Sequence, residues 1–285
     1  MAKLLEGKPI AERIKEEIRE QALSLRVKPV LASVMMGDDP GAVSYSKSQA
    51  RVAQELGIEY QPHNLKANTT ETHLLDFIKK LNTNKSVHGI IIQNPVPAQV
   101  DYKKLSSFID PGKDIEGIHP GNIGKLIFGG SRLIPCTAYA VMELILASGV
   151  DLYGKEAVIV GHSEIVGKPL ALLLLERFAT VTVCHIGTSK AGKLEGHVKR
   201  AEILIVAVGC PGLIKGAWVK EGSVVIDVGI NRVGDNIVGD VEFTAAEKRA
   251  AYITPVPGGV GPLTVVMLMR NLIEAIKSQQ SGEYV

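Results

Sequence analysis

The sequence lacks the features that mark a secreted disulfide-rich protein or a metalloprotein. Its 285 residues include only three cysteines, Cys136, Cys184 and Cys210, and no two of them form a C-x-x-C pair. We therefore expect neither a disulfide framework nor a zinc site, and such cysteine usage is typical of the reducing cytoplasm. The seven histidines form no H-x-x-x-H pattern and no His/Asp cluster, so no metal is predicted.

Charge imbalance and long apolar runs are also scarce. The net charge is only +2, which gives no reason to expect a nucleic-acid surface or a polybasic membrane patch. The apolar run Pro169–Leu175 is far shorter than the ~18–20 residues that a membrane-spanning helix needs. Aromatic residues make up 5% of the chain, a share compatible with an α/β protein whose core is Ile, Leu, Val and Ala.

What the sequence does contain is a regular alternation of strand and helix patterns. The first half predicts strands at 29–36, 59–65 and 89–93, with helices at 44–56 and 70–81 between them. This alternation indicates parallel βαβ units in an open sheet that is covered on both faces. Asn94–Pro97 then interrupts regular structure, because two prolines within three residues suit neither a helix nor a central strand.

The second half repeats the alternation after a segment rich in Gly, Pro and Asn. We expect Asp110–Gly130 to be a structured loop that joins two lobes. The elements predicted after it are a helix at 137–148, strands at 157–160, 180–184, 203–208 and 224–228, a helix at 165–178 and a closing helix at 263–278.

The segment Ala157–Pro169 has the order strand, tight turn and helix start. Gly161 permits the turn, Ser163 can cap the helix, and Gly167 allows helix and strand to approach closely. Exposed N–H groups at such a helix start are available to a pyrophosphate. The spacing G-x-S-x-x-x-G differs from the common G-x-G-x-x-G, so other strand–helix turns with glycine remain possible. The next strand ends at 184–188 without an acid or an arginine, so the general rule for cofactor choice gives no answer.

Four stretches together resemble the methylenetetrahydrofolate dehydrogenase/cyclohydrolase family. They are Gly37–Pro40 with Tyr45 after it, Lys113–Gly117, Gly161–Pro169 and Pro255–Thr264. Three shorter matches follow the same order, at 135–137, 225–231 and 239–241. The resemblance therefore covers nearly the whole chain, and the Pro255–Thr264 string is its most specific part.

The resemblance implies an α/β protein with two lobes around a cleft, the second of them a Rossmann-like dinucleotide-binding domain. We place the folate-binding catalytic lobe at residues 1–134, completed by the C-terminal helix 264–285, and the NAD(P)-binding lobe at 135–263. The implied reaction oxidises 5,10-methylenetetrahydrofolate by hydride transfer to NAD(P)⁺. Bifunctional members then add water to the methenyl product. The resemblance also implies a homodimer through the dinucleotide lobe, in the cytoplasm.

The same resemblance assigns roles to single positions. Catalytic roles fall on Tyr45, Gln49, Gln93 and Glu116. The implied substrate-binding residues are Tyr45, Gln93, Asn94, Pro95, Glu116, Pro257, Gly258, Gly259 and Thr264. The implied cofactor-binding residues are Gly161, His162, Ser163, Ile165, Val166, Ile186, Gly209 and Ile230. We interpret Asp227 as a residue that orders loops near the cofactor and Asp240 as structural.

One departure from the family pattern concerns proton transfer. The family's Tyr-x-x-x-Lys motif has its tyrosine at Tyr45, but Gln49 replaces the lysine. Residues i and i+4 share a helix face, whereas Lys47 lies roughly 200° around the helix from Tyr45. A lysine can move a proton when water attacks the methenyl carbon, but an amide cannot do so near neutrality. Hydride transfer needs only correct placement of two carbons.

We therefore expect dehydrogenase activity to persist and cyclohydrolase activity to be weak or absent. The alternatives are a conventional bifunctional enzyme, in which Gln49 and a water still support hydrolysis, and a non-catalytic folate- or nucleotide-binding relative. A further alternative is that Gln49 is only a surface helix residue. Asn94 and Glu116, where the family has leucine and aspartate, suggest an adjusted pterin pocket, although neutral drift could also produce them.

The cofactor turn departs as well. Members that use NADP have Gly-Arg-Ser there, and often a serine or arginine after the Cys-His of the second strand. Here these positions are His162 and Ile186. Loss of the guanidinium removes a charge-assisted contact to the 2′-phosphate. We therefore expect NAD⁺ to be preferred, with NADP⁺ possible.

Overall fold

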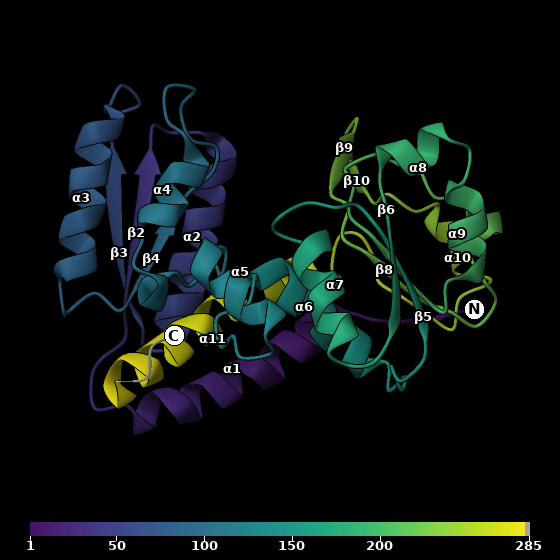
Figure 1. Cartoon of the computed structure of the whole chain (residues 1–285), viewed down its shortest axis with the longest axis horizontal. Helices are drawn as coiled ribbons and strands as arrows, with labels where there is room; N and C mark the ends of the chain where they lie inside the picture. The colour runs from purple at the N-terminus through teal and green to yellow at the C-terminus, as the bar shows by residue number, and fades with distance from the viewer. Residues whose placement is uncertain (283–285) are drawn as a thin grey trace. The chain divides into compact units, whose positions relative to one another are not determined.

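Parallel strands and the helices that connect them make up most of the chain (Figure 1). A computed structural model describes residues 1–282, so the last three residues of the predicted C-terminal helix 264–285 lie outside the described chain. Contacts divide the chain into two units, Met1–Arg13 with Thr137–Thr264, and Ile14–Cys136 with Val265–Val285. We refer to them by their sheets as the six-stranded unit and the three-stranded unit. The predicted α/β class with two domains on parallel sheets is confirmed.

The sheet of the three-stranded unit is parallel and has the order β3-β2-β4. Its strands are β2 (Val30–Met36), β3 (Glu59–Leu65) and β4 (Gly89–Ile92). Every residue of the central strand β2 is buried, which explains why its sequence is continuously apolar apart from Ser33. The edge strand β3 alternates between partly buried and exposed residues and is accordingly more polar.

Helices flank this sheet on both sides in Figure 1. Those that lie wholly in the unit are α2 (Pro40–Glu55), α3 (Glu71–Thr83), α4 (Tyr102–Phe108), η1 (Pro111–Lys113) and α5 (Pro120–Ile127). The unit boundary falls inside the two longest helices, α1 (Gly7–Ser24) and α11 (Gly261–Ser281). Helix α2 begins at Pro40, four residues before the predicted start at Ser44, because Asp39 accepts a hydrogen bond from Ala42 N and proline suits the first helical position.

The six-stranded unit has a parallel sheet with the order β1-β11-β8-β7-β5-β6. Its strands are β1 (Lys3–Leu4), β5 (Glu156–Val160), β6 (Thr180–Cys184), β7 (Ile203–Val206), β8 (Val224–Asp227) and β11 (Tyr252–Ile253), and a hairpin of β9 (Asn231–Val233) and β10 (Asn236–Val238) adds to it. The helices are α6 (Cys136–Ala147), α7 (Gly167–Leu175), α8 (Ile186–Lys190), α9 (Leu194–Arg200), η2 (Gly216–Trp218) and α10 (Phe243–Ala246). Strands β7 and β8 are buried throughout.

Two features differ from the sequence-based expectations. The first strand pairs with β11, so Met1–Arg13 lies in the six-stranded unit, although we had placed it with the lobe 1–134. The predicted loop Asp110–Gly130 contains the helix α5, which starts at Pro120 behind the capping residue His119. No helix of the described residues is long and apolar enough to cross a membrane.

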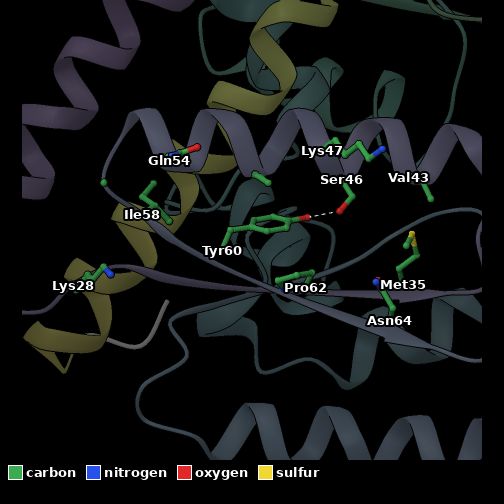
Figure 2. A pocket seen from close by; sticks show the side chains of 12 residues that line it. Lys28, Met35, Val43, Ser46, Lys47, Gln54, Ile58, Tyr60, Pro62 and Asn64 are labelled. Carbon is green, nitrogen blue, oxygen red and sulfur yellow. Dashed lines mark hydrogen bonds between the residues drawn. The ribbon is translucent and has the colours of Figure 1, made fainter.

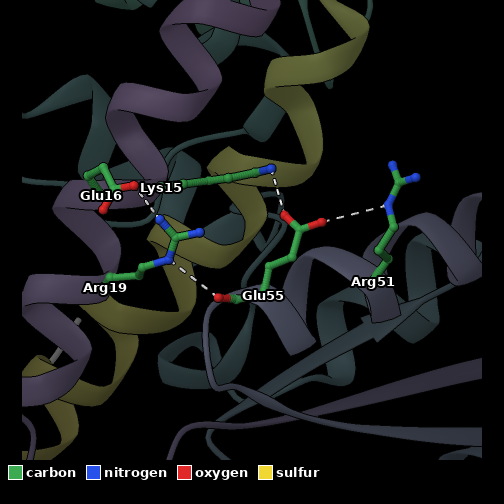
Figure 3. A network of polar contacts seen from close by, with 5 residues as sticks. All are labelled: Lys15, Glu16, Arg19, Arg51 and Glu55. Carbon is green, nitrogen blue, oxygen red and sulfur yellow. Dashed lines mark hydrogen bonds and ion pairs between the residues drawn. The ribbon is translucent and has the colours of Figure 1, made fainter.

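A cluster of charged side chains fastens α1 to the C-terminal end of α2 (Figure 3). Lys15 Nζ donates to Glu55 Oε2 at 2.7 Å, and the Arg19 guanidinium donates to the Glu55 backbone carbonyl at 3.4 Å. The hydrogen bond from Lys15 also lowers the pKa of the Glu55 carboxyl. An arginine on a terminal carbonyl complements the negative end of the helix dipole. These contacts fix the helix that carries Tyr45 and Gln49.

Asn271 of α11 fastens a second part of the three-stranded unit. Its side chain is fully buried, and its Nδ2 donates to the backbone carbonyls of Ile115 and Ile134, each at 2.8 Å. Ile115 directly precedes Glu116, so this amide holds the backbone beside a predicted site residue.

Asn271→Leu should lower the free energy of unfolding by about 2–4 kcal/mol, because two buried carbonyls lose their donor. Chemical denaturation measures the change. Gln280→Leu, on the exposed end of the same helix, is the matched control and should stay within about 0.5 kcal/mol of the parent. Equal effects of the two substitutions would contradict a structural role for the Asn271 amide.

Candidate functional site

Two glutamine side chains meet inside the three-stranded unit. Gln49 comes from α2, and Gln93 directly follows β4. Gln93 Nε2 donates to Gln49 Oε1 at 2.7 Å and to Ser33 Oγ at 2.9 Å. Gln49 is fully buried, so the alternative that it is merely a surface helix residue is wrong.

A residue that the sequence analysis missed completes this cluster. The Tyr60 hydroxyl, on the edge strand β3, donates to Gln49 Oε1 at 3.0 Å and lies 2.8 Å from Ser46 Oγ. Tyr60 belongs to no recognisable motif. Only its pairing with Leu31 in the sheet register brings it to the α2 side of the strand, and no pattern in the sequence reveals that position.

Helix α2 presents its residues to different surroundings. Tyr45 is 40% exposed, whereas Gln49, one turn later, is buried. Lys47 is exposed and lines a cavity of about 640 Å³ with Ser46 and Tyr60 (Figure 2). Gln49 is not among the described residues that line this cavity. Lys47 therefore does not stand in for the missing lysine.

Glu116 lies at the other polar cluster of this unit. It is half-buried and accepts a hydrogen bond from the Tyr102 hydroxyl at 3.2 Å. Burial, with the Asp114 carboxylate nearby, raises the pKa of Glu116 to about 8. Asn94 also hydrogen-bonds the Tyr102 hydroxyl, and the peptide bond between Asn94 and Pro95 is cis. Tyr102, which the sequence analysis missed, thus connects two predicted substrate-binding residues.

The residues before Glu116 hold its loop in place. Asp114 is buried and accepts hydrogen bonds from His119 N at 2.7 Å and from Asn122 Nδ2 at 2.9 Å. Lys113 Nζ donates to the backbone carbonyls of Leu81 and Asn84. The Glu116 carboxylate has room for a further donor, because among the described residues its side-chain hydrogen-bond partner is the Tyr102 hydroxyl.

The turn after β5 needs glycine at two positions. Gly161 has a φ of +126°, and a Cβ there would lie 2.3 Å from the Ala207 carbonyl oxygen. A Cβ at Gly167 would lie 2.0 Å from the Gly161 carbonyl oxygen. Ser163 Oγ accepts from Val166 N at 3.2 Å, so it closes the turn, while α7 starts at Gly167 and not at the predicted Ile165.

A cavity of about 400 Å³ opens at this turn. Four of the predicted cofactor-binding residues line it, namely Gly161, His162, Ser163 and Ile186, and the unpredicted His185 joins them. The rings of His162 and His185 are 5.2 Å apart. Ile165 and Val166 are not among the described lining residues; the first is half-exposed and the second is buried.

The loop that carries Gly209 is ordered by one carboxylate. Asp240 is fully buried and accepts hydrogen bonds from the backbone N–H groups of Val208, Gly209 and Cys210 at 2.8–3.0 Å. Asp227 accepts in the same way from Gly229, Asp240 and Val241. Burial raises the pKa of Asp227 to about 6. Both acids hold loops at the carboxyl ends of β7 and β8.

A second cavity of the six-stranded unit has a volume of about 350 Å³. It gathers four predicted substrate-binding residues, Pro257, Gly258, Gly259 and Thr264. Ile230, which we had assigned to the cofactor, lines this cavity and not the one at the Gly161 turn. Among residues 1–282, no group of three or more His, Cys, Asp or Glu side chains could hold a metal ion.

Comparisons with known proteins agree over both halves of the chain. Residues 5–116 match the family model for the tetrahydrofolate dehydrogenase/cyclohydrolase catalytic domain, and residues 135–280 match the model for its NAD(P)-binding domain. Bifunctional protein FolD 2 of Geobacter metallireducens is 48% identical over 286 residues, which cover 99% of each chain. The second domain is thus Rossmann-like, as predicted.

Solved structures agree equally well. The bifunctional methylenetetrahydrofolate dehydrogenase/cyclohydrolase FolD of Campylobacter jejuni has a TM-score of 0.94 and 43% identity, over 98% of this chain and 100% of that one. The Trypanosoma brucei dehydrogenase-cyclohydrolase, solved with NADP and an inhibitor, has a TM-score of 0.92 and 37% identity over 98% of both chains.

Glu116→Gln should change how stability depends on pH. Because the folded pKa of about 8 exceeds the ordinary value of 4.5, the stability that Glu116 contributes is complete below pH 4.5 and is lost as pH rises through 8. The glutamine variant cannot ionise. Its free energy of unfolding relative to the parent should therefore rise by about 1–3 kcal/mol between pH 5 and pH 9.

Denaturation curves at both pH values test this expectation. Glu221→Gln, at an exposed acid, should show no such gain. A constant difference in the free energy of unfolding between the Glu116 variant and the parent would contradict the raised pKa. The carboxyl group would then ionise normally, in surroundings that water can reach.

Proposed function

Because this chain belongs to the tetrahydrofolate dehydrogenase/cyclohydrolase family, we propose that it oxidises 5,10-methylenetetrahydrofolate with a nicotinamide dinucleotide and hydrolyses the methenyl product to 10-formyltetrahydrofolate. The observation that carries this proposal is the full-length identity to bifunctional relatives, which includes both domains. A non-catalytic relative is disfavoured, because such a protein need not keep both sets of site residues.

The dinucleotide fits the turn of the six-stranded unit. The backbone cradle at Gly161 and Gly167 leaves no room for a Cβ, and close backbone approach is what a pyrophosphate site requires. His162, Ser163 and Ile186 would line its cavity. When bound, the nicotinamide supplies the acceptor for the hydride.

The substrate would be held by the three-stranded unit. The exposed ring of Tyr45 would stack on the folate, and Glu116 in its ionised form would accept N–H groups of the pterin. Asn94 and Pro95 lie at the same cluster through Tyr102. These groups bind and orient, which is the main protein contribution that hydride transfer requires.

One observation favours a narrower function, in which hydrolysis is weak or absent. The buried Gln49 amide and its partners Gln93 and Tyr60 include no group that exchanges a proton readily at neutral pH. Burial raises the pKa of Tyr60, so its hydroxyl stays protonated. The bifunctional relatives favour hydrolysis, whereas this side-chain chemistry opposes it.

A paired assay separates the two functions. The protein should oxidise methylenetetrahydrofolate, and its effect on the decay of added methenyltetrahydrofolate reveals whether hydrolysis is catalysed. Gln49→Lys should accelerate that decay about tenfold to 100-fold over the parent, since a positioned acid–base group contributes this much or more. Gln54→Lys adds the same charge at an exposed position of α2 and should leave the decay rate of methenyltetrahydrofolate equal to that with the parent. Strong hydrolysis by the parent, with no gain from Gln49→Lys, would refute the narrower function.

We further propose that NAD⁺ is preferred over NADP⁺. His162 and Ile186 line the cavity where an arginine and a serine would hold a 2′-phosphate. The NADP bound to the Trypanosoma brucei relative favours the opposite preference.

His162→Arg should raise kcat/KM for NADP⁺ about tenfold or more, because it restores a charge-assisted phosphate contact. Steady-state kinetics with both cofactors measure the ratio, and Lys220→Arg outside this cavity serves as the control. A higher kcat/KM for NADP⁺ in the unmodified protein would refute the preference. We also propose that the protein forms a homodimer through its dinucleotide-binding lobe and that it is located in the cytoplasm.

A further inference from the structure

A directed chain of hydrogen bonds converges on the side-chain carbonyl of Gln49. Tyr60 donates its single hydroxyl hydrogen to Gln49 Oε1 at 3.0 Å, so the Ser46 hydroxyl at 2.8 Å must be the donor to Tyr60. From the other side, Gln93 Nε2 donates one hydrogen to Gln49 Oε1 and the other to Ser33 Oγ. The two lone pairs of Gln49 Oε1 are therefore both used by the protein.

Given the orientation of Gln93, this arrangement favours one orientation of the Gln49 amide. Turning Gln49 over would set its Nε2 against Gln93 Nε2, which already donates to Ser33. The amide nitrogen of Gln49 is buried, and it has no hydrogen-bond partner within the described chain. A buried donor without an acceptor costs about 1–3 kcal/mol of stability. Proteins therefore seldom contain one unless a ligand supplies the acceptor.

Tyr60 is well suited to hold the amide. Its ring packs on the α2 side of β3, and its hydroxyl points at Ser46 (Figure 2). Ser46 precedes Gln49 by three residues on α2, so both lie on neighbouring parts of one helix face. Because burial raises the pKa of Tyr60, the hydroxyl remains a donor over the whole neutral range.

We propose that Tyr60 is a positioning residue. Together with Gln93 it holds the Gln49 carbonyl by hydrogen bonds, so that the Gln49 N–H group faces a hydrogen-bond acceptor of the bound tetrahydrofolate. The proposal rests on the proposed function, because it takes the folate site to be the one beside Gln49. It assigns the Gln49 amide a role in binding. A lysine and a glutamine both donate hydrogen bonds, so this role is retained when glutamine replaces lysine, whereas proton transfer requires the amine.

Isothermal titration of tetrahydrofolate, without oxygen, tests the assignment through a double-mutant cycle. Tyr60→Phe keeps the ring and should weaken binding about threefold to tenfold, the range of one net hydrogen bond. Gln49→Ala should weaken it at least as much. In the Gln49→Ala background, Tyr60→Phe should not change the affinity for tetrahydrofolate further, because Tyr60 acts on the folate through the Gln49 amide.

Kinetics add a readout that a purely structural role would not move. Tyr60→Phe should raise KM for methylenetetrahydrofolate by the same factor, while kcat and the KM for NAD⁺ stay within about twofold. Lys47→Ala, at an exposed side chain of the same cavity, is the control and should bind tetrahydrofolate as the parent does. Thermal unfolding of each variant confirms that it folds.

The outcomes separate the two hypotheses. A parent protein that binds tetrahydrofolate but does not turn over its methylene derivative overturns the proposed function, and the binding cycle still tests Tyr60. Equal effects of Tyr60→Phe with and without Gln49 overturn the positioning role. An unchanged affinity of Gln49→Ala also overturns it, since the amide would then face only protein or water. A parent that binds no tetrahydrofolate overturns both.

Discussion

The hydrogen bond between Gln93 and Gln49 is the central contact of the candidate site in the three-stranded unit. It joins the end of a buried strand to the middle of α2 at 2.7 Å, in a place where neither amide is exposed. This bond links α2 to the end of β4 within the three-stranded unit. On the same helix, Tyr45 is exposed and Lys47 lines the cavity that also includes Ser46 and Tyr60. The charged cluster at Glu55 holds the far end of the same helix.

A large part of this architecture is predictable from the sequence. The strands Glu59–Leu65 and Thr180–Cys184 have the predicted bounds. The Gly161 turn was recognisable because only glycine tolerates a φ of +126° beside the Ala207 carbonyl. The family followed from strings of motif residues, and both domain matches agree with it.

The missed features share a physical cause, which is that their partners are distant in the sequence. The two residues of β1 form a strand only through their pairing with β11, about 250 residues away along the chain. Tyr60 and Tyr102 act through hydroxyl contacts that depend on sheet register and loop path, and no spacing rule encodes these. Ile230, an expected cofactor-binding residue, lines the cavity with Pro257 because its loop leads into the hairpin β9–β10. Local patterns predict elements, but long-range packing selects which side chains meet.

A crystal structure with a bound tetrahydrofolate and the dinucleotide would test the account most directly. The account predicts the folate beside Tyr45, with the Gln49 amide nitrogen within hydrogen-bond distance of one of its acceptors and the Glu116 carboxylate on the pterin N–H groups. It also predicts that the Gln49 carbonyl keeps its two donors, Tyr60 and Gln93. Folate bound elsewhere, for example in the cavity lined by Lys47, or a Gln49 amide turned so that its carbonyl faces the ligand, would contradict it.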